Sequence, residues 1–218
     1  MIYSNKRKLT LCGWLENNNK SEYCSPLKLQ KFLLLYELFS KVDGEPADFN
    51  RLCGYKHGPV FSTVFGDYTH DRSEFDCAAQ SNYSSNKSII NEDRAKRSAF
   101  IVESLSEDEL SEISHKLNLW RSKYPEIRHG IRQVDLDEDD FNDDDMVIIK
   151  TLESMYPMSL VENSVIISVN TKNFVFDKNA VHRLSEQNVD TLGILSTYED
   201  LMNPVYVSID EEGRLIVD

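Results

Sequence analysis

The chain has 218 residues, of which 40% are hydrophobic and 28% charged, so it can bury a core and is too apolar to be disordered throughout. No apolar run approaches the roughly 18–20 residues that span a bilayer. The start of the chain, residues 1–10, is basic and polar and lacks the apolar region of a secretory signal. We therefore expect a soluble, cytoplasmic protein that does not enter a membrane.

The net charge of −13 is unevenly distributed along the chain. Residues 1–100 carry 14 Lys or Arg against 12 Asp or Glu, whereas residues 101–218 carry 10 against 25. This acidity disfavours nucleic acid as a partner, because such binding depends on neutralising phosphates. The acidity is equally consistent with a basic protein partner and with a role in solubility alone.

The first third of the chain predicts two helices. Apolar residues at 9, 11, 14 and 15 fit a short helix that ends at Asn17–Asn19. Ser25 and Pro26 have the residue types of a helix N-cap and first turn, and they open a buried helix over 27–41. Its predicted core face includes Leu29, Phe32, Leu33 and Tyr36.

The middle of the chain is predicted as a brief strand, a loop, an acidic stretch and further helices. Residues 49–55 form a short strand or extended segment, Gly58-Pro59 begins a helix over 60–68, and the Ser- and Asn-rich stretch 71–88 is a loop. Asn91 caps a helix to Ser104. Ser106 and Glu109 form a capping box for a helix that carries Leu110, Ile113, Leu117 and Trp120 and ends before Pro125. The acidic stretch 135–145 precedes a last core helix over 146–156. Val60, Val64 and Trp120 complete the predicted core.

The pattern changes after Pro157. Residues 165–169 and 174–176 are rich in β-forming residues, and residues 206–209 and 215–217 flank a turn sequence, Asp210-Glu211-Glu212-Gly213. We predict a mainly α protein: a compact helical core over 1–156 with a short β element, followed by a C-terminal α+β extension over 157–218. The extension is too apolar for a free arm, so it packs on the core, on a small sheet or on a partner.

Motifs for catalysis, metals and cofactors are missing. The run Asp135, Asp137 and Asp139 imitates a calcium loop, but the sixth position is Asp140 instead of Gly and the twelfth is Met146 instead of Glu. No His/Cys set has zinc spacing, and no phosphate-binding or nucleophile motif occurs. Four cysteines without a C-x-x-C pair are interpreted as buried structural thiols. We expect a protein that is not an enzyme and holds no metal or cofactor.

Three stretches of sequence, in order, resemble one family. They are Leu27–Tyr36 (LKLQKFLLLY), Tyr55–Val60 (YKHGPV) with Val64 and Tyr68 after it, and Leu110–His115 (LSEISH) with Trp120 after it. Together they resemble the Panacea, or SocA-like, antitoxin domain over residues 8–152. Ser114 and Glu37-Leu38 differ from that family's usual Thr and Ala-rich sequence.

This resemblance implies a helical antitoxin that neutralises a cognate protein toxin by direct contact, in some cases as an adaptor that presents the toxin to a protease. The alternatives are a phage-encoded or regulatory protein that binds a host factor, or one that binds operator DNA. The candidate partner-binding residues are Lys28, Lys31, Lys56, His57, Tyr68 and His115.

Each candidate also has a purely structural interpretation. Lys28 and Lys31 extend from the exposed edge of the long helix, where they either snorkel or contact a partner. His57 either shapes the turn before Gly58-Pro59 or belongs to an interface. His115 either lies with Trp120 in a partner-facing patch or is a partly buried histidine of the core.

Overall fold

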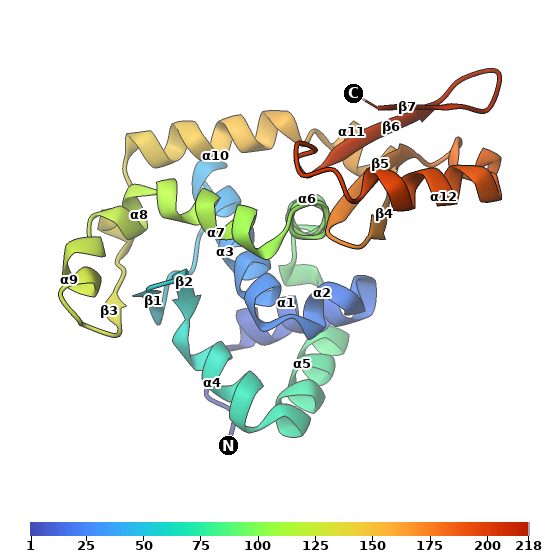
Figure 1. Cartoon of the computed structure of the whole chain (residues 1–218). Helices are drawn as coiled ribbons and strands as arrows, with labels where there is room; N and C mark the ends of the chain where they lie inside the picture. The colour runs from blue at the N-terminus through green and yellow to red at the C-terminus, as the bar shows by residue number, and fades with distance from the viewer. Residues whose placement is uncertain (218) are drawn as a thin grey trace.

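The computed structural model describes residues 1–217 and has a helical core with a β-containing extension at one side (Figure 1). The central helix α3 (Pro26–Val42) is surrounded by other helices, as its apolar sequence predicts. Ser25 caps it, with its hydroxyl accepting from Lys28 N at 3.2 Å, and Pro26 is the first helical residue. The remaining core helices are α1 (Lys6–Asn18), α2 (Lys20–Cys24), α4 (Ser62–His70), α5 (Arg72–Asn86), α6 (Glu92–Ser104), α7 (Glu107–Lys116), α8 (Asn118–Arg121), α9 (Tyr124–Arg128) and α10 (Asp143–Met155).

The predicted core is confirmed except at one position. Leu29, Phe32, Leu33 and Tyr36 on α3 are buried, and so are Val64 and Trp120. Val60 is half-buried, since it faces a pocket instead of the core. The capping box of Ser106 and Glu109 at the start of α7 is also confirmed.

Gly58 and Pro59 belong to a strand, so the prediction that they begin a helix was wrong. β2 (Gly58–Phe61) pairs antiparallel with β1 (Leu52–Tyr55), which also pairs with β3 (Val134–Asp135). Because β2 is an edge strand, Pro59 can occupy it although it lacks an N–H to donate. The helix that follows, α4, therefore begins at Ser62.

The polar stretch 71–88 is largely helical, which corrects its prediction as a loop. α5 buries Phe75 and Ala79, four residues apart, and the Ala79 backbone packs closely against Gly13 of α1. Asn82 and Asn86 donate from their side chains to the carbonyls of residues 78 and 82, so their amides do not compete with the helix. Tertiary packing on α1 thus overrides the low helix propensity of this sequence.

The helix predicted to end before Pro125 is broken into two, and a further short helix contains Pro125 itself. α7 ends at Lys116, Leu117 is extended, and α8 and α9 follow. The Asp145 carboxylate accepts from Asn118 N and from Leu119 N, the latter at 2.9 Å, and so holds the start of α8. Asp145 also lies in the first turn of α10, which begins three residues earlier than predicted.

The extension contains both predicted strand pairs and two helices that the sequence did not indicate. The four-stranded sheet has the order β4-β5-β6-β7, with β5 and β6 parallel and the other pairs antiparallel. The helix α12 connects the two parallel strands and lies alongside the sheet (Figure 1). The elements are α11 (Met158–Asn163), β4 (Ser164–Val169), β5 (Lys172–Asp177), α12 (Glu186–Leu195), β6 (Val205–Ile209) and β7 (Leu215–Val217).

Two hydrophobic clusters hold the chain together. The large one joins the core helices and extends to Val161 and Val175, whereas the small one lies within the extension and includes Phe174, Phe176 and Leu192. Of the three placements predicted for the extension, packing on the core and building a small sheet both occur.

Among residues 1–217, none of the helices combines the length and the apolar character that crossing a membrane requires.

Candidate functional site

The three sequence stretches that resemble one family meet at a single place. Lys31 on α3 belongs to the first stretch, Gly58 on β2 to the second, and Ser114 on α7 to the third. The Lys31 ammonium donates to the Ser114 hydroxyl at 2.7 Å. A Cβ on Gly58 would lie 2.6 Å from Lys31 Nζ and 2.8 Å from Ser114 Oγ, so only glycine fits between them.

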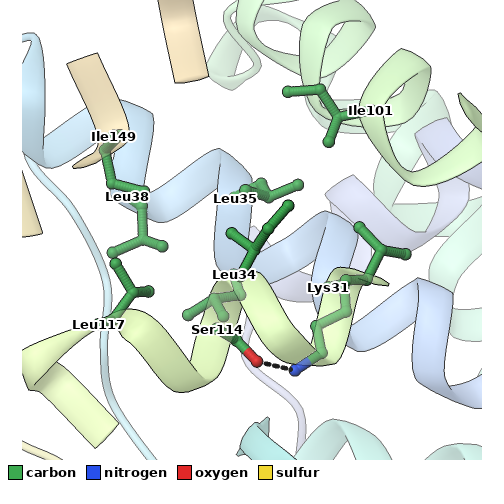
Figure 2. Close-up of a pocket in the computed structure, with 10 residues that line it drawn as sticks. Lys31, Leu34, Leu35, Leu38, Ile101, Ser114, Leu117 and Ile149 are labelled. Carbon is green, nitrogen blue, oxygen red and sulfur yellow. Dashed lines mark hydrogen bonds between the residues drawn. The ribbon is translucent and has the colours of Figure 1, made fainter. Parts of the chain in front are cut away.

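Lys31 is buried, which corrects its predicted place at the exposed edge of the helix. Only 3% of the residue is exposed. Figure 2 shows its nitrogen meeting the Ser114 hydroxyl beside a group of leucine and isoleucine side chains. These side chains surround a void of about 10 Å³, which is at the lower limit for one water molecule. Burial lowers the pKa of Lys31 from 10.5 to about 7.

Gly58 has a backbone conformation that favours glycine as well as a tight environment. Its φ is +111°, in the region that residues with a Cβ rarely adopt. A residue with a Cβ at position 58 would therefore be strained and would displace the ends of the Lys31 and Ser114 side chains where β2 approaches α3 and α7.

His115 and Trp120 form the next layer of the site. Their rings stack with centroids 4.1 Å apart, and the Trp120 indole donates to the Tyr55 carbonyl at 2.9 Å, which fixes α8 to the β1–β2 turn. His115 Nε2 is buried and has no hydrogen-bond partner within residues 1–217. Burial, followed by the nearby Lys31 ammonium and His57, lowers the pKa of His115 below its usual 6.5.

A pocket of about 290 Å³ opens beside this cluster, between the start of α3 and the β1–β2 turn. Lys31 lies in its wall. The other lining residues are mostly apolar or aromatic: Pro26, Leu27, Gln30, Tyr55, His57, Pro59, Val60 and Phe65. Gln30 is held in place because its side-chain oxygen accepts from Phe61 N at 2.8 Å. The pocket therefore combines an apolar lining with one buried amine.

The other candidate residues are distributed in different environments. Lys56 and His57 are exposed at the β1–β2 turn, and His57 lines the pocket. Lys28 is half-buried and pairs with Glu22 at 2.6 Å. Tyr68 is 5% exposed and donates to the Tyr23 carbonyl at 2.9 Å, so it packs in the core and does not line the pocket.

Sequence reasoning missed the pocket itself, together with Gln30, Tyr55 and Phe65. The available signal was the order of the three stretches, but only the fold shows that residues 31, 58 and 114 touch. Among the cysteines, Cys12 and Cys53 are buried as predicted, whereas Cys24 and Cys77 are exposed.

In residues 1–217, no group of three or more His, Cys, Asp or Glu side chains is arranged to hold a metal ion. Within the acidic run, Asp137 and Asp140 cap a short 3-10 turn at Glu138–Asp140.

No family model matches the sequence, and searches of curated proteins and of solved structures gave no significant match.

Proposed function

We propose that this protein is an antitoxin of the Panacea type, which neutralises a cognate protein toxin by stoichiometric binding. The observation that carries the proposal is that the three family-like stretches form one cluster at Lys31, Gly58 and Ser114. These three residues come from separate stretches that each match the family pattern, and in the fold they contact one another. Their contact supports a common ancestry of this core with the family.

The β1–β2 turn is the proposed toxin-facing surface. Lys56 and His57 are exposed there, and Phe65 at the edge of the pocket is 42% exposed although it is a large apolar residue. An exposed aromatic residue beside cationic side chains is typical of the residues that dominate protein interfaces. The acidic second half of the chain would add long-range attraction to a basic toxin.

The extension is the proposed source of specificity. Large apolar residues are exposed along it, among them Val189, Ile194, Tyr198 and Met202. Because it lies outside the family-like stretches, it is free to differ between proteins that neutralise different toxins.

The test is co-expression in bacteria with each product encoded beside this gene, with growth as the readout and co-purification as the check on binding. We expect one neighbouring product to stop growth and this protein to restore it. A Phe65→Asp variant should lose rescue, whereas Lys87→Glu, a charge reversal at an exposed lysine outside the pocket, should keep it. If no neighbouring product is toxic or is retained by this protein, the antitoxin proposal is wrong.

A further inference from the structure

The strongest unexplained feature of the site is a buried cation without a counter-ion. Lys8 and Lys31 are both almost fully buried, but the Lys8 ammonium pairs with Glu37 and lies 3.5 Å from the Asp48 carboxylate. No carboxylate within residues 1–217 forms an ion pair with Lys31, and its single hydrogen bond goes to the neutral Ser114 hydroxyl. A buried ammonium is costly unless it is paired, so this one has unused capacity for an anion.

The Lys31 ammonium also has donors left over. It carries three N–H groups, of which Ser114 accepts one. Beside it, His115 Nε2 is buried without a partner, about 3.6 Å from the position that a Gly58 Cβ would take. An ammonium with two unused N–H groups and an imidazole nitrogen without a partner therefore lie near each other where α3, β2 and α7 meet.

The pocket meets this cluster at Lys31, whereas Ser114 and His115 do not line it. Lys31 is part of its wall, and Leu27, Pro59, Val60 and Phe65 supply apolar surface around it. Its volume of about 290 Å³ is at the lower end of the range for small-molecule sites, roughly 300–1,000 Å³. A ligand of one ring or one short chain would fill it.

We propose that this pocket binds a carboxylate carried on an apolar body, with the Lys31 ammonium as its counter-ion and the apolar wall around the rest of the ligand. A single carboxylate matches a single cation. A phosphate has more charge and more oxygens to satisfy, and the arginine fork that often binds it is absent from the lining of this pocket, which has one lysine.

Two sources can supply this chemistry: a free organic acid, or the apolar C-terminal residue of a protein chain, which carries its carboxylate on the same Cα as its side chain. The inference stands independently of the proposed toxin, because it rests on the pocket alone.

The test is calorimetric titration of the full chain at about pH 6 with 4-phenylbutyrate and hexanoate as free acids, and with N-acetyl-Gly-Gly-Phe as a chain terminus, each beside its neutral amide. We expect at least one acid to bind roughly tenfold or more tightly than its amide, since an ionised carboxylate accepts a stronger hydrogen bond from an ammonium than a neutral amide does. Binding of only the free acids or only the peptide supports the proposal and identifies the source.

Two variants test whether the preference for acid over amide depends on Lys31. Lys31→Met should abolish the preference for acid over amide, whereas Lys28→Met, on the same helix but paired with Glu22, should keep it. Affinity for the acid should fall as the pH rises from about 6 to about 8.5, because Lys31 loses its proton in this range. His115 on α7 is the titratable group that interacts electrostatically with the Lys31 ammonium, and His57 on the turn lines the same pocket, so His57→Gln tests whether His57 affects binding of the acid.

The proposal is overturned if none of the acids binds the wild-type protein, or if acids and amides bind equally. It is also overturned if Lys31→Met retains the preference. Should Lys31→Met fail to fold, the comparison of acids with amides on the wild-type protein at the two pH values still decides the matter.

Discussion

The Lys8 ammonium and the Glu37 carboxylate form an ion pair, 2.5 Å apart, in which both side chains are closed off from solvent. Arg7 binds the same carboxylate through two nitrogens, at 2.9 and 2.7 Å, and Asp48 N donates to it at 2.9 Å. Glu37 therefore joins α1, α3 and the segment before β1. This explains how a charged residue is accommodated in the middle of the most apolar helix.

Glu37→Gln should destabilise the protein by about 3 kcal/mol, because it removes the close carboxylate from the buried Lys8 ammonium and leaves the Asp48 carbonyl at 2.7 Å and the Asp48 carboxylate at 3.5 Å. Glu74→Gln is the matched control, since Glu74 pairs with the exposed N-terminal ammonium and the change should have little effect on stability. Urea unfolding measures both. If the two changes lower the free energy of unfolding equally, breaking the buried ion pair costs no more than breaking the exposed one, and the prediction is wrong.

Phe32→Ala should destabilise the protein by about 3–5 kcal/mol, because Phe32 is fully buried and stacks on Trp14 with ring centroids 5.7 Å apart. Phe65→Ala, at a position that is 42% exposed, should cost less than about 1 kcal/mol. Thermal unfolding followed by circular dichroism compares the two, and a small effect at Phe32 would contradict its place in the core.

Gly58→Ala should cost about 1–3 kcal/mol, because alanine is strained at φ +111° and its Cβ would displace the Lys31 ammonium from Ser114. Gly193→Ala is the control: Gly193 lies in α12 with open space around it, so the change should be neutral or stabilising by up to about 1 kcal/mol. A neutral result for Gly58→Ala would mean that the turn and α3 do not approach as closely as described.

Lys31 should make stability depend on pH in a defined direction. Its pKa is about 7 in the folded protein against 10.5 ordinarily, so between these values the unfolded chain binds more protons and stability rises with pH. Below about pH 7 both states are protonated and the full cost of burial is present. The free energy of unfolding of Lys31→Met, measured relative to that of the wild-type protein, should therefore be highest at about pH 6. It should fall by a few kcal/mol towards about pH 10.

The matched measurement uses Phe65→Ala, which removes no titratable group, so its difference from the wild-type protein should not follow the pH dependence expected for Lys31. A difference for Lys31→Met that does not vary with pH would contradict the burial of the charged amine.

Deleting residues 158–218 should leave a folded but less stable core. The extension contributes Val161 and Val175 to the large cluster, and Asn173 donates to the Ser104 carbonyl at 3.1 Å, so its loss uncovers part of α6. We expect a helical circular dichroism spectrum with a lowered Tm, and loss of toxin neutralisation if the extension confers specificity. A truncated protein that is folded and fully neutralising would refute that role.

The sequence by itself determined the helices whose apolar periodicity and caps agree, such as α3 with Ser25 and Pro26, and α7 with its capping box. It also determined the change to β structure after Pro157, because β-branched runs and turn residues are local signals. The tertiary structure alone decided that the polar stretch of α5 is a helix, since its stability comes from Phe75 and Ala79 packing on α1. It likewise decided that Gly58-Pro59 is an edge strand and that Lys31 is buried. A lysine beside leucines on a helix has the same local pattern whether it reaches solvent or not, and only the approach of β2 and α7 encloses it.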